Sequence, residues 1–178
     1  MKLRVLFYDR LDSTNNLARK MAEEGACEGT VVVANYQTGG RGRFKRRWVS
    51  RAGENLLFTI ILRPKLKAGE AGIITHVAAA TIQMVLRDEL GLAVKLKRPN
   101  DVLVGKKKIA GILTESKGER EKLDYLVVGV GLNVNSRKTS IPKRATSVWL
   151  ECGKKENLRV LLDKILEIFI KKYSALCN

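Results

Sequence analysis

Apolar segments of strand length outnumber those of helix length in this chain, and several follow one another with only a turn between them. Their composition predicts strands at residues 3–9, 30–36, 55–62 and 94–97, a hairpin over 102–115 that turns near Gly105, and one long strand or a strand pair over 123–134. Hairpins join antiparallel strands, so the chain lacks the regular strand–helix alternation of a parallel sheet.

Three other segments repeat apolar residues at helical spacing. Asp12–Asn15 is typical of a helix N-cap and predicts a helix that ends near Gly25; further helices are predicted over 70–90, before Gly91, and over 157–176. We expect the 70–90 helix to be core scaffold. The combination predicts an α+β fold, a mixed β-sheet with helices mainly on one face.

Length and composition suit one domain that occupies residues 1–178, since 45% of the residues are hydrophobic. No segment reaches the roughly 18 uninterrupted apolar residues of a membrane span, and the N-terminus lacks a signal-peptide pattern. The three cysteines, Cys27, Cys152 and Cys177, are odd in number and far apart, which indicates reduced thiols in a cytoplasmic protein.

The segment from Gln37 to Trp48, here called the glycine-arginine loop, contains three glycines, five cations and two aromatic residues. Glycines let backbone N–H groups approach an anion, and arginines add forked donors for phosphate or carboxylate. Trp48 offers a flat face on which a base can stack. A solvated basic loop has the same composition, but the combination favours an anionic ligand that carries a base.

The chain is strongly basic, with 34 Lys and Arg against 18 Asp and Glu and a formal net charge of +16. This balance indicates a polyanionic partner, a phosphorylated ligand or an acidic protein surface. A basic nucleic-acid-binding domain is therefore one alternative.

Several common site motifs are absent from the sequence. Gly129–Asn133 begins like a dinucleotide fingerprint but has no third glycine and no following helix, and no P-loop motif occurs. His76 is the only histidine and lies in an apolar helical segment, which excludes a histidine metal cluster and a Ser/His/Asp arrangement. Mg²⁺ held mainly by substrate phosphates is the metal we expect.

Polar patches also occur at predicted strand ends, where binding sites are common. Each has a simple structural explanation: Ser13 caps a helix, Asn100 and Asp101 form a turn, Lys108 is a solvated edge cation, and Asn133 is a turn residue.

Taken in order, these patches resemble the catalytic domain of biotin protein ligases, which attach biotin to a lysine of carboxylase carrier domains. The matching segments span nearly the whole chain: Asp12–Asn15, Gln37–Arg43 with Trp48, Pro99–Asp101, Lys108–Leu113, Gly129–Asn135 and Thr146–Ser147. The resemblance implies a fold like that of class II aminoacyl-tRNA synthetases. It also implies formation of biotinyl-5′-AMP from biotin and ATP, and transfer of biotin to a carrier lysine.

The resemblance assigns three overlapping sets of site residues. Biotin binding is implied for Ser13, Thr14, Asn15, Gln37, Gly40, Arg41, Gly42, Arg43, Lys108 and Gly111. Binding of ATP or the adenylate is implied for Arg43, Trp48, Asn100, Lys108 and Asn133, with Trp48 stacked on adenine. Catalytic roles are implied for Lys108, Arg43 and Asp101, the last as acceptor of the carrier lysine's proton.

The chain departs from the family pattern in several places. Arg98 stands where the family usually has Trp, and Lys45 where it often has Gly. Strand alternation with Leu96 favours burial of the Arg98 stem; a role toward ATP phosphates or an acidic carrier is the alternative. We expect neither an N-terminal winged helix nor a C-terminal β-barrel.

A lipoate-type ligase of the same fold is a second alternative, although its usual histidine-bearing motif is absent from the sequence. A homodimer is left open, and no membrane partner is expected.

Overall fold

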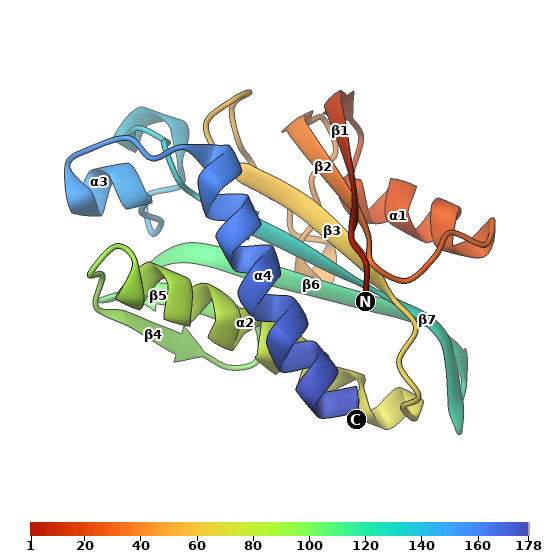
Figure 1. Ribbon diagram of the computed structural model, residues 1–178. Coiled ribbons are helices and arrows are strands. Elements are labelled where there is room, and N and C mark those ends of the chain that lie inside the picture. Colours follow the sequence, from red (N-terminus) through yellow and green to blue (C-terminus); the bar gives the residue numbers. More distant parts are fainter. Residues whose placement is uncertain (178) are drawn as a thin grey trace.

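The computed structural model describes residues 1–177, except the side chain of Lys45. Its centre is a seven-stranded sheet in the order β1-β2-β3-β7-β6-β5-β4 (Figure 1). Only β1 and β2 run parallel; the other neighbours are antiparallel, so the predicted mixed sheet is confirmed. The strands span Arg4–Leu11 (β1), Thr30–Gln37 (β2), Leu56–Leu62 (β3), Val94–Lys97 (β4), Asp101–Val104 (β5), Lys107–Glu119 (β6) and Lys122–Leu132 (β7).

The three predicted helices are present as α1 (Thr14–Glu23), α2 (Ala71–Asp88) and α4 (Leu158–Cys177). The sequence analysis missed α3 (Val148–Cys152), which is too short for a periodic pattern; it begins at the Ser147 cap and ends at Gly153, whose φ is 74°. Short 3₁₀ turns occupy Arg43–Lys45, Ala68–Glu70 and Lys138–Ser140. Residues 122–132 form one long strand, which decides between the two predictions for that segment.

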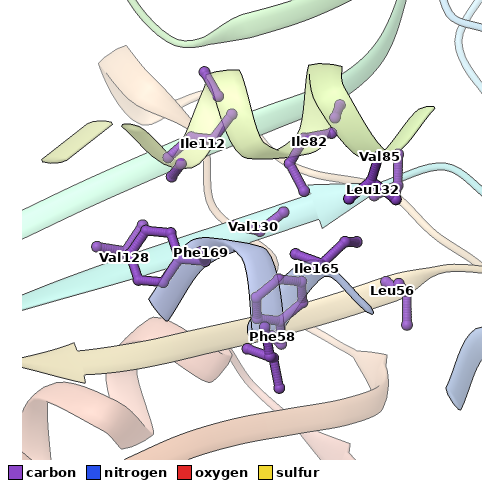
Figure 2. Close-up of a cluster of buried hydrophobic side chains, with 14 of the residues drawn as sticks. Leu56, Phe58, Ile82, Val85, Ile112, Val128, Val130, Leu132, Ile165 and Phe169 are labelled. Atoms are coloured by element: carbon purple, nitrogen blue, oxygen red, sulfur yellow. The ribbon is translucent and has the colours of Figure 1, made fainter. Parts of the chain in front are cut away.

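The main core lies between the sheet and the helices α2 and α4 (Figure 2). Alternate residues of the central strands face these helices, among them Phe58 on β3, Val128 and Val130 on β7, and Ile112 on β6. By length and composition Ala68–Asp88 is apolar enough to cross a membrane. Its apolar side instead packs into this core, as expected for core scaffold.

The opposite face of the sheet is covered in part by α1. Ala18 and Ala22 of α1 pack with Val32, Ile61 and Val127 in a smaller apolar cluster. Helices therefore lie mainly, but not entirely, on one face. The part of this face beyond the start of α1, over β6 and β7, carries the candidate site.

Candidate active site

Three glycines form a floor on the α1 side of the sheet: Gly111 on β6, and Gly129 and Gly131 on β7. A Cβ added to Gly131 would lie 2.5 Å from the Trp48 ring, and one on Gly111 would lie 2.8 Å from Lys108. A Cβ on Gly129 would collide with the Asn15 amide. The absence of side chains here lets three functional side chains lie directly on the backbone of the sheet. The sequence analysis rejected Gly129 and Gly131 as a dinucleotide motif and included them in a segment that resembles the ligase family, but it did not predict this floor.

A cavity above this glycine floor contains most of the predicted site residues. Its lining includes Ser13, Thr14, Asn15, Gln37, Arg41, Gly42, Arg43, Trp48, Asn100, Lys108 and Gly111. The free volume is about 50 Å³, and the Trp48 ring and the Lys108 side chain occupy the space directly above Gly131 and Gly111.

One end of the cavity is built from neutral hydrogen-bonding groups. The Gln37 Oε1 atom accepts a hydrogen bond from Thr14 N at 2.7 Å and lies 3.0 Å from Thr14 Oγ1. Thr59 Oγ1 lies 2.8 Å from Thr14 Oγ1 and 2.7 Å from Asn15 Oδ1. Ser13 occupies the N-cap position of α1 but makes no capping hydrogen bond with its side chain. Its hydroxyl therefore remains available to a ligand.

The glycine-arginine loop folds back on itself as a small hairpin beside the cavity. Trp48 N donates to Gly40 O at 2.9 Å, and Gly42 N donates to Arg46 O at 2.7 Å. A Cβ on Gly40 would lie 2.5 Å from Trp48 O, so this glycine is required by close backbone approach. Gly40 supports the loop and is not part of the cavity lining.

Arg43 and Phe44 occupy the turn of this hairpin. The Arg43 guanidinium carbon lies 4.9 Å from the centre of the Phe44 ring, and Arg43 Nη1 lies 3.4 Å from Asn100 Oδ1. Asn100 is fixed in turn by donating from Nδ2 to Ile112 O at 2.7 Å. Arg43 and Asn100 therefore lie together at the cationic end of the cavity.

Lys108 reaches the same end through an irregularity in the β5–β6 pairing. Val102 pairs with Ala110 but Leu103 pairs with Lys108, so Ile109 is an extra residue. Ile109 and Ala110 both face the main core, and Lys108 and Gly111 both face the cavity. The Lys108 ammonium lies 2.7 Å from Asp101 Oδ1 and 5.4 Å from the Trp48 ring centre.

Asn133 lies outside the cavity lining and is hydrogen-bonded to Thr146 and Val148. It is 3% exposed and donates from Nδ2 to Thr146 O at 3.0 Å. Its Oδ1 is buried and has no partner among the described residues. Leaving a buried amide oxygen without a donor costs free energy, which makes this atom a candidate acceptor for a ligand donor.

Strand alternation with Leu96 predicted burial of the aliphatic part of the Arg98 side chain, but the alternation does not extend to Arg98. Strand β4 ends at Lys97, and Arg98 lies exposed in the connection to β5, joined to Pro99 by a cis peptide bond. The expected burial of its stem beside Leu96 was therefore wrong, because the pleat ends one residue earlier.

Glu115 was missed by the sequence analysis. Its carboxylate pairs with Arg41 and accepts a hydrogen bond from Asn15 Nδ2 at 2.8 Å. No local motif marks a single glutamate on a strand, so only its tertiary partners identify it. Across the described residues, no group of three or more His, Cys, Asp or Glu side chains gathers as a metal site.

Comparison with known proteins identifies similar chains. Residues 7–133 match the biotin/lipoate A/B protein ligase family. The bifunctional ligase/repressor BirA of Bacillus subtilis is 35% identical over 173 residues, which cover 95% of this chain and 53% of BirA. The biotin--[acetyl-CoA-carboxylase] ligase of Paracoccus denitrificans is 42% identical over 131 residues, which cover 70% of this chain and 52% of that protein.

Among solved structures, the biotin protein ligase from Aquifex aeolicus in complex with biotin and ATP superposes with a TM-score of 0.83 at 31% identity. The superposition covers 98% of this chain and 72% of that one. The chain spans about half the length of the curated relatives it matches. These matches favour the ligase hypothesis over the nucleic-acid-binding alternative.

Proposed function

The chain belongs to the biotin/lipoate A/B protein ligase family, and on this basis we propose that it is an ATP-dependent biotin protein ligase. In this proposal it activates biotin as biotinyl-5′-AMP and transfers the biotinyl group to a lysine of a biotin carboxyl carrier protein. The Aquifex aeolicus structure, a biotin protein ligase with biotin and ATP, supports the choice of substrates.

The proposal depends above all on the difference in polarity between the two ends of the cavity. Its neutral end presents Ser13, Thr14 and Gln37, and its cationic end presents Arg43 and Lys108. Biotin has the same asymmetry, with an uncharged urea at one end and a carboxylate at the other. Uncharged donors and acceptors satisfy the urea without leaving a charge unpaired, while the two cations offset the carboxylate.

Activation requires no general base in this mechanism, because a carboxylate is already ionised near neutral pH. A carboxylate oxygen of biotin attacks the α-phosphorus of ATP, the bond to the bridging oxygen breaks, and pyrophosphate leaves. Arg43 and Lys108 bring the two anions together and stabilise the charge that develops between them. Mg²⁺ would be held mainly by the ATP phosphates and would neutralise the leaving pyrophosphate.

Transfer uses the same end of the cavity. The neutral amine of the carrier lysine attacks the carbonyl carbon of the mixed anhydride, the carbon–oxygen bond to phosphate breaks, and AMP leaves. Asp101 lies beside Lys108 and is the acceptor that we propose for the amine proton. The unpaired Oδ1 of Asn133 is suited to the adenine amino group, and the Trp48 ring to its face.

An ATP–pyrophosphate exchange assay with purified protein tests the proposal. Exchange that depends on biotin is expected, with little or none when lipoate replaces it. Exchange that lipoate supports better would identify a lipoate-type ligase, and exchange with neither acid would reject acid activation by this chain.

The proposal also covers the carrier protein, the cellular location and the oligomeric state. The carrier protein is expected to accept biotin at one lysine, which mass spectrometry of the product would locate. A cytoplasmic location fits the free thiols of Cys27, Cys152 and Cys177. A homodimer remains a prediction, which sedimentation of the purified chain would test.

A further inference from the structure

Glu115 joins three separate elements beside the cavity. It lies on β6, and its Oε2 atom pairs with Arg41 Nη2 of the glycine-arginine loop and accepts from Asn15 Nδ2 of α1 at 2.8 Å. Its Oε1 atom lies 3.6 Å from Arg19 Nη1, also on α1. The Glu115 side chain is 24% exposed, so water competes only in part for these contacts. One carboxylate therefore links the loop to α1 and to the sheet.

The loop needs such a counter-charge because its own cations repel one another. Arg41, Arg43, Arg46 and Arg47 lie within seven consecutive residues that also include Gly42. Glu115 pairs with Arg41, at the start of the hairpin. Among the described residues, Arg43, two positions further on, has the 3.4 Å contact with Asn100 and the Phe44 ring beside it, and no carboxylate partner. Fixing Arg41 therefore leaves Arg43 as the cation directed to the ligand.

The same carboxylate is connected to the neutral end of the cavity. The Oδ1 atom of Asn15 accepts a hydrogen bond from the Thr59 hydroxyl. Its Nδ2 atom donates to Glu115 and, at 3.1 Å, to Leu113 O. Thr59 contacts Thr14, and Thr14 contacts Gln37. Gln37 and Arg41 stand on either side of Gly39 and Gly40, so this chain of contacts holds both ends of the glycine segment.

We propose that Glu115 is a positioning residue for biotin: by pairing with Arg41 and Asn15 it holds the loop in its closed position over the bound ligand. The inference rests on the proposed ligase function. Glu115 itself touches no ligand in this scheme, and it acts through Arg41 on the loop and through Asn15 on the group that receives the urea.

The direction of the change in biotin affinity on neutralising Glu115 distinguishes a positioning role from a purely electrostatic one. A glutamate near an anion-binding site repels the anion, so its neutralisation alone would strengthen biotin binding. A glutamine at this position keeps the shape but has only one acceptor oxygen, so its amide N–H groups face Arg41 or Arg19. If Glu115 positions the loop, Glu115→Gln weakens biotin binding in spite of the favourable change in charge.

The experiment measures biotin dissociation constants by calorimetry for the wild type, Glu115→Gln and Glu119→Gln. Glu119 is exposed, lies on the same strand and outside the cavity lining, and its substitution changes the net charge by the same amount. We expect Glu115→Gln to raise the dissociation constant on the order of tenfold, through faster release. The exchange rate at saturating biotin should change by less than about threefold, and Glu119→Gln should match the wild type.

Equal or tighter biotin binding by folded Glu115→Gln overturns the inference and leaves the ligase proposal intact. A wild type that binds no biotin removes the ligase proposal itself. If Glu115→Gln melts below the assay temperature, Glu115→Asp replaces it; this variant keeps the charge but is one methylene too short to hold Arg41 and Asn15 together. Weaker binding by Glu115→Asp supports positioning, and unchanged binding overturns it.

Discussion

The ammonium group of Lys108 forms an ion pair with Asp101 across the β5–β6 hairpin, with a distance of 2.7 Å between Nζ and Oδ1. The pair exists because an extra residue in β6 directs Lys108 to the cavity face, over the bare backbone of Gly111. In the proposed reaction an arriving carboxylate and phosphate compete with Asp101 for this cation. Asp101 is then released next to the incoming carrier lysine.

Replacing Lys108 by Ala should lower biotin-dependent ATP–pyrophosphate exchange by about 10²–10³-fold, because one charge stabiliser is lost at the reacting centre. The melting temperature should change little, since both partners of the ion pair are partly exposed. Lys107→Ala, at the exposed neighbouring position, should leave exchange near the wild-type rate. Retention of more than half of the exchange activity by Lys108→Ala would remove this lysine from the mechanism.

Gly131→Ala should displace Trp48, because the added Cβ would lie 2.5 Å from the Trp48 ring. We expect a stability loss of about 1–3 kcal/mol from overpacking, together with a marked rise in the Michaelis constant for ATP. Adding Trp48→Ala should relieve the clash and recover the melting temperature without recovering the ATP constant. Gly72→Ala, which has open space around it in α2, serves as the control and should be at least as stable as the wild type.

Arg43→Gly should release the activated intermediate more readily, because the Arg43 guanidinium is proposed to hold its phosphate. Free adenylate acylates lysines without selection, so biotin should appear on an unrelated protein added to the reaction. Labelling is read with streptavidin, and Arg46→Ala, in the same loop but outside the cavity lining, is the matched control. If Arg43→Gly forms adenylate yet bystander labelling stays at the wild-type level, Arg43 does not retain the intermediate.

Residues 39–47 should exchange amide hydrogens quickly without ligand and slowly with biotin. The loop is rich in glycine and in cations that repel one another, and an anionic ligand offsets that repulsion. The amide of Gly42, which closes the hairpin by donating to Arg46 O, is the most direct probe. Amides of β7 provide the internal reference. Equal protection of the loop in both states would show that it does not act as a lid.

Local patterns in the sequence predicted most of the fold, because strand and helix periodicities depend on neighbouring residues. The strand at Val94–Lys97 has its predicted bounds, and the three long helices were found near theirs. The short helix at Val148–Cys152 was missed since five residues hold little more than one turn. The burial of Arg98 was wrongly inferred from a pleat that ends before it.

The sequence alone also contained the residue types of the site: a glycine-rich cationic loop (37–48), a serine at a helix N-cap (Ser13), and a lysine three residues before a glycine (Lys108 and Gly111). Their arrangement was decided only in the tertiary structure. The register shift that directs Lys108 into the cavity depends on the partner strand β5, and the contact between Arg41 and Glu115 joins residues 74 positions apart. Periodicity describes which face of an element a residue occupies, but pairing between elements determines which side chains meet across it.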